Sequence, residues 1–319
     1  MTRLKSCSRR KTVRCAALQE QGGGQSGARL RTYLIGREQG KSFATVVIKR
    51  LNHYSFGTVI PFILLHAGCV AVFFVPFRWS WVGLMLAMYV VRMFGITAGY
   101  HRYFSHRTYK LARGWQFLIA FLAETSGQKG VLWWAAHHRV HHRHADRERD
   151  IHSPGLRGFW WAHVGWVLSN DYDGYDAALI KDFSKFPELQ WLDKHYLVPP
   201  VVLGGLLLLV GGWGAFVWGF VASTVLLFHG TFTINSLAHL WGTRRFDTPD
   251  DSRNNFVLAI ITLGEGWHNN HHKFMYACQH GIRWWEVDFT YYALKLLSWL
   301  GVARDLRGIR VPLPESKAA

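Results

Sequence analysis

Two long apolar stretches lie one after the other in the first third of the chain. Phe56–Phe77 holds 22 residues without Asp, Glu, Lys or Arg, and after Arg78 the stretch Trp79–Gly99 is interrupted only by Arg92. A helix rises about 1.5 Å per residue, so about 20 apolar residues cross the roughly 30 Å hydrocarbon core of a bilayer. The pattern predicts two membrane-spanning helices joined by a turn near residues 76–79.

A second uncharged region of 49 residues runs from His195 to Thr243. Gly211 and Gly212 predict a turn inside it, which leaves spans at Tyr196–Val210 and Trp213–Ile234. Shorter apolar stretches occur at residues 115–123, 158–168 and 256–263. Each of these is too short to cross a bilayer, so we expect interfacial or re-entrant segments there.

The predicted fold class is an all-α integral membrane protein with four transmembrane helices arranged as two hairpins. An even number of spans places residues 1–55, 100–195 and 239–319 on one side of the membrane. Basic residues near the span ends and in the segment 139–149 mark this side as cytosolic. We therefore expect a cytosolic helical cap on a multi-pass protein of the bacterial inner membrane.

The formal net charge of +17 is concentrated near the N-terminus, where residues 1–50 contain 12 Lys or Arg and 2 Asp or Glu. We expect residues 1–41 to form a basic, disordered tail and residues 42–319 to form the membrane domain. A basic protein can bind nucleic acid, but no nucleic-acid motif is present and the long apolar runs argue against that class. Basic segments beside spans instead attract anionic lipid.

Histidine marks the candidate chemistry of this chain, which has 18 of them. Short motifs contain His101 and His106 (HRYFSH), His138, His141 and His142 (HRVHH), and His268, His271 and His272 (HNNHH), while His239 stands alone. Residues three and four apart share one face of a helix. The predicted topology places all of these motifs on the cytosolic side, where they can converge.

Imidazole is a common ligand of iron, copper and zinc at neutral pH. These histidines outnumber the four to six or so ligands that one ion takes, so the pattern predicts two metal ions close together. A metal transporter is the non-enzymatic alternative. It would place its ligands near the middle of the membrane, whereas these motifs lie at or beyond the cytosolic ends of the predicted spans.

Five segments, in this order and spacing, resemble the membrane fatty acyl desaturases, and the stearoyl-CoA (delta-9) branch most of all. They are GITAGYHRYFSHRTYK (95–110), HRVHH (138–142), RGFWWAHVGW (157–166), NSLAHLWGTR (235–244) and GEGWHNNHH (264–272). The likeness runs from about residue 50 to about residue 305. The resemblance implies an O₂-dependent enzyme that introduces a cis double bond into a saturated acyl chain.

The resemblance also implies a non-haem di-iron centre with nine histidine ligands: His101, His106, His138, His141, His142, His239, His268, His271 and His272. It implies that Asn235 reaches one metal through a water molecule, and Asn235 and His239 are four apart, as on one helix face. The expected grouping is His101, His106, His138, His142 and His272 on one iron. His141, His239, His268 and His271 are expected on the other.

Several other residues near these motifs need an interpretation. Asp150 and Glu265 are candidates to accept hydrogen bonds from the outer N–H groups of ligand histidines, and Asp146 is either such an acceptor or a surface charge. Eight other histidines are not expected to bind metal: His66, His137, His144, His152, His163, His195, His229 and His280.

Electron supply and acyl carrier are two further expectations. The sequence carries no flavin, nicotinamide or Cys-based iron–sulfur motif, so we expect a separate ferredoxin, rubredoxin or small cytochrome with its reductase. Just before HRVHH the animal acyl-CoA enzymes carry an Arg-Asp pair that helps to bind the nucleotide headgroup, whereas this chain has Ala136 and His137. That departure leaves acyl-CoA, acyl carrier protein and intact lipid open, with acyl-CoA favoured by the other motifs.

The second span leads directly into His101, so its preceding turns are expected to line the deep end of an acyl tunnel. Tyr89 and Met93 are four apart on that span and share a face. In the family, bulk at the position of Met93 shortens the pocket, which favours palmitoyl over stearoyl chains. The alternative interpretation is that Met93 packs on a neighbouring helix. The rival enzyme class is a membrane hydroxylase or ketolase, which uses the same histidine chemistry to insert oxygen.

Overall fold

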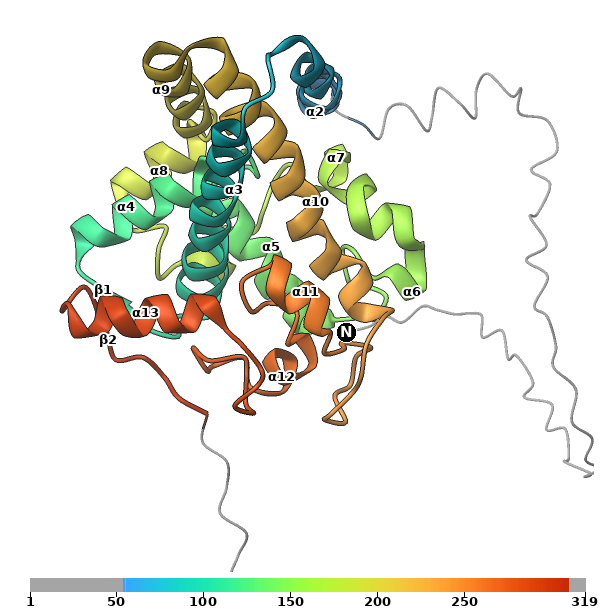
Figure 1. Cartoon of the computed structure of the whole chain (residues 1–319). Coiled ribbons are helices and arrows are strands. Elements are labelled where there is room, and N and C mark those ends of the chain that lie inside the picture. Colours follow the sequence, from blue (N-terminus) through green and yellow to red (C-terminus); the bar gives the residue numbers. More distant parts are fainter. Residues whose placement is uncertain (1–53, 55, 310–319) are drawn as a thin grey trace, which may run out of the picture. The chain divides into compact units, whose positions relative to one another are not determined.

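The computed structural model describes Tyr54 and residues 56–309 (Figure 1). The tail expected at residues 1–41, and its expected boundary, lie outside the described residues. The described part is mainly helical. It also holds one antiparallel pair of two-residue strands, β1 (Lys110–Leu111) and β2 (Ala303–Arg304), which pair Lys110 with Arg304.

The first expected span begins where the sequence predicts it. Helix α2 (Phe56–Gly68) continues as a 3₁₀ helix at Cys69–Phe74, three residues short of the expected end. Its apolar side chains lack protein cover: Phe73 is 86% exposed and Leu64 is 63% exposed. An exposed apolar surface of this length is typical of a helix that faces lipid.

The second expected span is longer than predicted. Helix α3 (Trp79–Phe94) continues as a π-helix at Gly95–Ser105, so the helical run passes through His101. Gly95 and Gly99 allow helix α4 (Arg113–Glu124) to approach closely, because an added Cβ at either position would lie 3.0 Å from an atom of α4. This close contact fixes the end of the run that carries His101.

The third apolar region forms one helical run with a break. Helix α9 (Val198–Ala215), a π-helix at Phe216–Ala222, helix α10 (Ser223–Asn235) and a 3₁₀ turn at Leu237–His239 follow in succession. Inside α9, Gly212 has φ 69° and ψ −167°, which only glycine adopts easily. Beyond this break the chain folds back, since Gly204 lies against the Phe220 ring.

Three helical segments in the described part of the chain are therefore long and apolar enough to cross a membrane: Phe56–Phe74, Trp79–Ser105 and Val198–His239. The third contains the break at Gly212, within the turn that the sequence predicts. Figure 1 shows α3 and α10 running lengthwise through the described part, with α2 and α9 near one end and α12 (His268–Lys273) near the other. The three shorter apolar stretches fall on α4, on the segment around α7 (Trp166–Leu168) and on α11 (Phe256–Ile261), and none of them counts as a span.

Short elements fill the segments on either side of the third apolar region. Before it come α5 (Val131–His144), α6 (Pro154–Arg157), a π-helix at Trp161–Gly165, α7 (Trp166–Leu168), 3₁₀ helices at Asn170–Tyr172 and Ala177–Ile180, and α8 (Pro187–Lys194). After it come α11 (Phe256–Ile261), α12 (His268–Lys273) and α13 (Phe289–Trp299).

The start of α5 is held by two carboxyl groups, the buried Glu124 and the half-buried Asp193. Asp193 accepts hydrogen bonds from the backbone N–H groups of Leu132 and Trp133, at 2.8 and 2.9 Å, and Glu124 accepts one from Val131 at 2.9 Å. Carboxyl oxygens satisfy the free N–H groups of a helix N-terminus. Because α5 carries the HRVHH motif, this anchor helps to fix the position of three histidines.

Candidate metal centre

Nine histidines from separate elements converge in two clusters. The first cluster holds His101 from the π-helix after α3, His106 just beyond it, His138 and His142 from α5, and His271 from α12. The second cluster holds His141 from α5, His239 from the 3₁₀ turn after α10, and His268 and His272 from α12. Within each cluster the candidate ligand atoms lie within 4.8 Å of one another.

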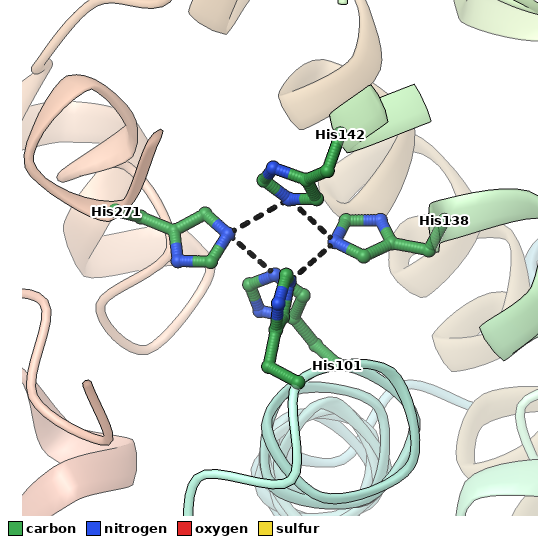
Figure 2. Close-up of side chains that lie close together, drawn as sticks. His101, His138, His142 and His271 are labelled. Atoms are coloured by element: carbon green, nitrogen blue, oxygen red, sulfur yellow. Dashed lines mark hydrogen bonds between the residues drawn. The ribbon is translucent and has the colours of Figure 1, made fainter. Parts of the chain in front are cut away.

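The Nε2 atoms of the first cluster point at one another (Figure 2). The Nε2 of His271 lies 3.1 Å from that of His101 and 3.0 Å from that of His142. The Nε2 of His138 lies 3.0 Å from that of His106 and 2.9 Å from that of His142. A ring of nitrogen atoms at these distances surrounds a common centre.

This arrangement fits a cation better than a hydrogen-bond network. A neutral imidazole has one donor and one acceptor nitrogen, so a single Nε2 cannot donate to two neighbouring Nε2 atoms. Burial, followed by the neighbouring rings, holds the pKa of His138, His142 and His271 well below the usual value. The rings are therefore neutral at physiological pH, which is the state that binds metal.

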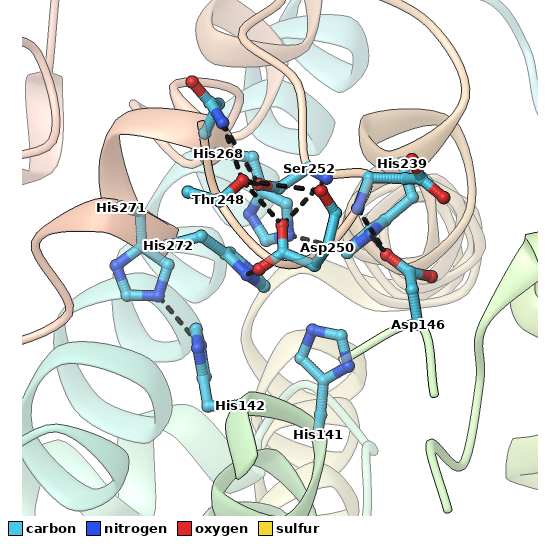
Figure 3. A network of polar contacts seen from close by, with 12 residues as sticks. His141, His142, Asp146, His239, Thr248, Asp250, Ser252, His268, His271 and His272 are labelled. Carbon is cyan, nitrogen blue, oxygen red and sulfur yellow. Dashed lines mark hydrogen bonds and ion pairs between the residues drawn. The ribbon is translucent and has the colours of Figure 1, made fainter. Parts of the chain in front are cut away.

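The second cluster, shown in Figure 3, also fits a bound cation better than a hydrogen-bond network. The Nε2 atoms of His239 and His268 lie 3.0 Å apart. The Nε2 atoms of His141 and His272 are buried without a hydrogen-bond partner. Buried polar atoms without a partner are costly, and a shared metal ion would satisfy all four nitrogens.

The grouping expected from the sequence is wrong for two residues, because the structure exchanges His271 and His272 between the clusters. On α5, His138 and His142 share a cluster while His141 faces the other; on α12, His268 and His272 share a cluster while His271 faces the other. Around a helix, positions four apart differ by only about 40°, so they face the same way. Neighbouring positions, such as His141 and His142, differ by about 100°. Each helix lies between the two clusters and sends residues to both.

Carboxylates hold the outer nitrogens of four of these rings. The Nδ1 atoms of His101, His141, His239 and His272 lie 2.6, 3.1, 2.7 and 2.9 Å from Glu265, Asp150, Asp146 and Asp250, respectively. A carboxylate accepts from Nδ1–H, which fixes the tautomer and directs the lone pair of Nε2 inward. Asp146, left open between two interpretations, thus contacts the second cluster.

These contacts perturb the carboxylates strongly. Burial raises the pKa of Asp150, but the His141 and His152 rings outweigh it and hold the pKa far below the usual range. Hydrogen bonds from His239 and His272 likewise overcome burial and lower the pKa of Asp146 and Asp250. Three ionised carboxylates therefore surround the second cluster, whereas Glu265 contacts the first.

Glu265 is itself part of a buried network. The guanidinium of Arg102, which is fully buried, lies 3.0 Å from Glu265 and 3.0 Å from Asp288. The same Arg102 donates to Nδ1 of His280 at 3.2 Å, and the His280 ring centroid lies 4.5 Å from that of His271. Arg102 neutralises much of the carboxylate charge beside the first cluster.

Sequence reasoning missed Asp250 and set aside His152 and His280. Asp250 lies in a loop that carries no histidine motif, so no local signal marks it. His152 stacks on His141 with ring centroids 4.3 Å apart, and a spacing of eleven residues does not predict such a contact. His137, also set aside, is buried and donates to the Trp133 carbonyl at 2.9 Å.

Asn235 lies beside the first cluster for a reason that differs from the expected one. Helix α10 ends at Asn235, and His239 belongs to a separate 3₁₀ turn, so the two do not share the face of one α-helix. Asn235 instead lines a narrow cavity with Trp134, His138 and Thr231. This cavity brings an amide side chain close to the histidines.

Met93 lines the same narrow cavity, together with His101 and Glu265. Tyr89, one turn earlier, donates a 2.5 Å hydrogen bond from its hydroxyl to the Ile261 carbonyl. Both side chains press on Gly230 of α10, where an added Cβ would lie 2.5 Å from the Tyr89 oxygen and 3.1 Å from the Met93 methyl. Met93 therefore borders the space beside the histidines, whereas Tyr89 packs behind it against Gly230 and is not among the residues that line this cavity.

The fold and the site define a helical protein with membrane-length apolar segments and two buried histidine clusters able to hold metal. Residues 46–297 match the fatty acid desaturase family. The chain therefore belongs to this family and is an oxidoreductase, as the resemblance in sequence motifs predicts.

Individual relatives differ in the substrates that their names give. The sn-1 stearoyl-lipid 9-desaturase of Anabaena variabilis is 37% identical over 77% of this chain and 91% of its own length. The acyl-CoA C20 Delta5-desaturase of Anemone leveillei is 37% identical over 76% of this chain and 78% of its own length. The chloroplastic palmitoyl-monogalactosyldiacylglycerol delta-7 desaturase of Arabidopsis thaliana is 34% identical over 79% of this chain and 68% of its own length.

Proposed function

We propose that this protein is an O₂-dependent desaturase that introduces a cis double bond at the delta-9 position of a saturated long-chain acyl group. The observation that carries the proposal is the pair of histidine clusters beside a narrow cavity whose walls include the apolar side chains of Met93, Ile96, Trp134 and Ile234. The net reaction consumes one O₂, two electrons and two protons. It converts one –CH₂–CH₂– unit to –CH=CH– and releases two water molecules.

The proposed cofactor is a pair of iron ions, one in each cluster, with Asn235 contributing through water. Iron that reduces O₂ supplies the oxidant needed to break an unactivated C–H bond. Histidine-rich sites also accept zinc and copper, so the choice of iron rests on the reaction. The carboxylates Asp146, Asp150, Asp250 and Glu265 hold the ligand rings in the tautomer that binds metal.

Side chains of this chain position the substrate. Trp134, Ile96 and Ile234 line the cavity beside His101 and His138 and supply an apolar wall for the acyl chain. Met93 lines this cavity and Tyr89 packs beside Met93 against Gly230, so in this proposal their bulk limits how much chain passes the histidines.

The proposed topology is four membrane crossings in two hairpins, with the histidine clusters on the cytosolic side of a bacterial inner membrane. The break at Gly212 and the contact of Gly204 with Phe220 support a turn between a third and a fourth crossing. We propose a separate electron donor, a ferredoxin, rubredoxin or small cytochrome with its reductase. Exposed basic residues on the cytosolic side would attract an acidic donor of this kind.

The relatives act, by their printed names, on lipid-bound or CoA-bound chains and at the delta-9, delta-5 or delta-7 positions. Position and carrier therefore need a direct measurement. We expect a host that expresses the protein to accumulate delta-9 monounsaturated chains, detected by gas chromatography with double-bond location. His141→Ala should give no product while the protein remains in the membrane. A hydroxylated product would favour the hydroxylase alternative, and a product that His141→Ala still forms would contradict the proposed site.

A further inference from the structure

A second, much larger cavity of about 490 Å³ lies away from the histidines, between the apolar helical segments. Its walls come from α2 (including Pro61 and Phe62), from α9 (including Val201 and Gly205) and from the helix that follows the break at Gly212 (including Phe228). Its size falls within the range of ordinary ligand pockets. These three walls belong to segments that are long and apolar enough to cross a membrane, and residues 127–129, 167–168 and 196–197 complete the lining.

This membrane cavity leads toward the metal centre. It shares Gln128, Val167 and Phe232 with a third cavity, which is small, differs from the one that Met93 lines, and also includes His138 and Asn235 in its lining. Gln128 donates a 3.1 Å hydrogen bond to Thr231, another residue that lines this small cavity. The large cavity therefore lies next to the space beside the first histidine cluster, with Gln128, Val167 and Phe232 between them.

The attachment of α2 leaves one side of the large cavity open. On one side α2 contacts α10 through two pairs of rings. Nε2 of His66 lies 3.0 Å from Nε2 of His229, and the ring of Phe62 stacks on that of Phe228. On the other side lie Leu197 and Val201 of the α9 region, which are 58% and 68% exposed. The cavity thus has an apolar rim at a surface that faces the bilayer.

The lining does not suit a nucleotide headgroup. Among the described residues that line the cavity, Lys129 is the one that carries a charge, and its ammonium group is already held 2.8 Å from Asp173. At the positions just before HRVHH, Ala136 and His137 are both buried and supply no charge to a phosphate. Coenzyme A carries several phosphate charges, which bind well only to basic groups.

We infer that the acyl group reaches the histidines from within the bilayer, as an ester of a membrane glycerolipid, through the cavity between α2 and α9. This inference rests on the proposed desaturase function and specifies its substrate class. An apolar opening inside the membrane admits a lipid tail without moving it through water, which would expose apolar surface. The ester and headgroup stay at the interface, near the cytosolic ends of α2 and α9.

Two glycines provide a matched pair of variants. Gly205 lines the large cavity, and an added Cβ there meets nothing within 4 Å, so we expect the ring of Gly205→Phe to obstruct the cavity. Gly83 on α3 is exposed and also has nothing within 4 Å of an added Cβ. Gly83→Phe therefore makes the same substitution in a membrane helix on a surface outside the cavity lining, and serves as the control.

The test uses the full-length protein in liposomes, with iron, a ferredoxin and its reductase. One arm supplies phosphatidylglycerol with an isotopically labelled stearoyl chain, and the other supplies labelled stearoyl-CoA from the aqueous phase. We expect labelled monounsaturated product on the glycerolipid without passage through the CoA pool. Gly205→Phe should lower that rate about tenfold or more, the scale of a blocked pocket, and Gly83→Phe should leave it unchanged.

Product formed only from acyl-CoA, or an unchanged lipid rate in Gly205→Phe, would overturn the inference while leaving the desaturase proposal intact. The absence of product in both arms would instead contradict the proposed function. A photoactivatable phosphatidylglycerol with a mid-chain diazirine then tests the cavity without any turnover. Crosslinks at residues 57–65 and 197–205 that Gly205→Phe removes would support the inference, and crosslinks spread over all lipid-facing helices would overturn it.

Discussion

His271 and His272 are neighbours on α12, yet their imidazoles serve different clusters. Their ring planes are 87° apart, with centroids separated by 5.7 Å. His271 points its Nε2 at His101 and His142, while Nδ1 of His272 contacts Asp250. One turn of helix therefore supplies ligands to both proposed metal sites and fixes the distance between them.

Substitution of these two neighbours should remove different metal ions. We expect His271→Ala to weaken the site of the first cluster and His272→Ala that of the second, with product lost in both variants. Protein enriched in ⁵⁷Fe should bind about two iron ions per chain, because the nine ligands exceed one ion's need. Mössbauer spectra of the variants should each lack a different component. Loss of the same component in both would contradict the grouping, and His195→Ala, at an exposed position, is the control.

Loss of an outer carboxylate should weaken the second site without removing a ligand. Asp250→Asn keeps the size of the side chain but removes the charge that holds Nδ1–H of His272. We expect the metal affinity of that site to fall by about 10–100-fold, the usual effect of such partners. Metal content after dialysis against a weak chelator measures this change. Asp247→Asn, at a fully exposed neighbouring position, should retain parental metal content, and equal loss in both variants would contradict the assigned role of Asp250.

Met93 should set the preferred chain length. Its side chain is buried and lines the cavity beside His101. Because its bulk shortens the space for the acyl chain, we expect palmitoyl chains to be desaturated in preference to stearoyl chains. A methionine adapts its shape, and discrimination of about 1–3 kcal/mol is expected for such a mismatch. Met93→Ala should shift the product ratio toward stearoyl-derived chains in a direct competition. An unchanged ratio would show that Met93 does not limit the acyl chain.

Glu124 should make stability depend on pH. Burial, with a further contribution from Asp193, raises the pKa of Glu124 to about 9 from an ordinary value of 4.5. The folded protein therefore keeps a proton that the unfolded chain releases above about pH 4.5. The free energy of unfolding consequently falls as the pH rises from about 4.5 to about 9, where the folded protein releases this proton as well. Glu124→Gln retains an acceptor for the Val131 N–H but has no proton to lose.

We therefore expect the parent to show a larger drop in melting temperature between about pH 6 and about pH 9 than Glu124→Gln does. Differential scanning fluorimetry in detergent measures it. Glu188→Gln is the control, because Glu188 is an exposed partner of Arg113 with a lowered pKa. Equal pH dependence in the parent and Glu124→Gln would contradict a protonated Glu124.

The sequence predicts the linear features of this protein well. Helices start at Phe56 and Trp79 as expected, Gly212 breaks the third apolar region where a turn is expected, and membership of the desaturase family is confirmed. These features depend on local composition and on motif spacing, which a sequence displays directly. The nine motif histidines are also brought together by the fold.

Features that depend on the packing of distant segments could not be predicted. The contact of Asp250 with His272 joins a loop to α12, and the exchange of His271 and His272 depends on how α12 is rotated against α5. The end of α10 at Asn235 breaks the helix on which the shared face of Asn235 and His239 depended. The large cavity needs the relative placement of α2, α9 and α10, which hydrophobic periodicity does not specify.

The most direct test of the proposed reaction follows the atoms that leave the acyl chain. A lipid-bound stearoyl chain carrying two deuterium atoms on each of carbons 9 and 10 is supplied under ¹⁸O₂, and the product is analysed by mass spectrometry. Desaturation predicts a delta-9 product that has lost two deuterium atoms and contains no ¹⁸O. A product that has lost one deuterium and gained one ¹⁸O would show hydroxylation and would contradict the account.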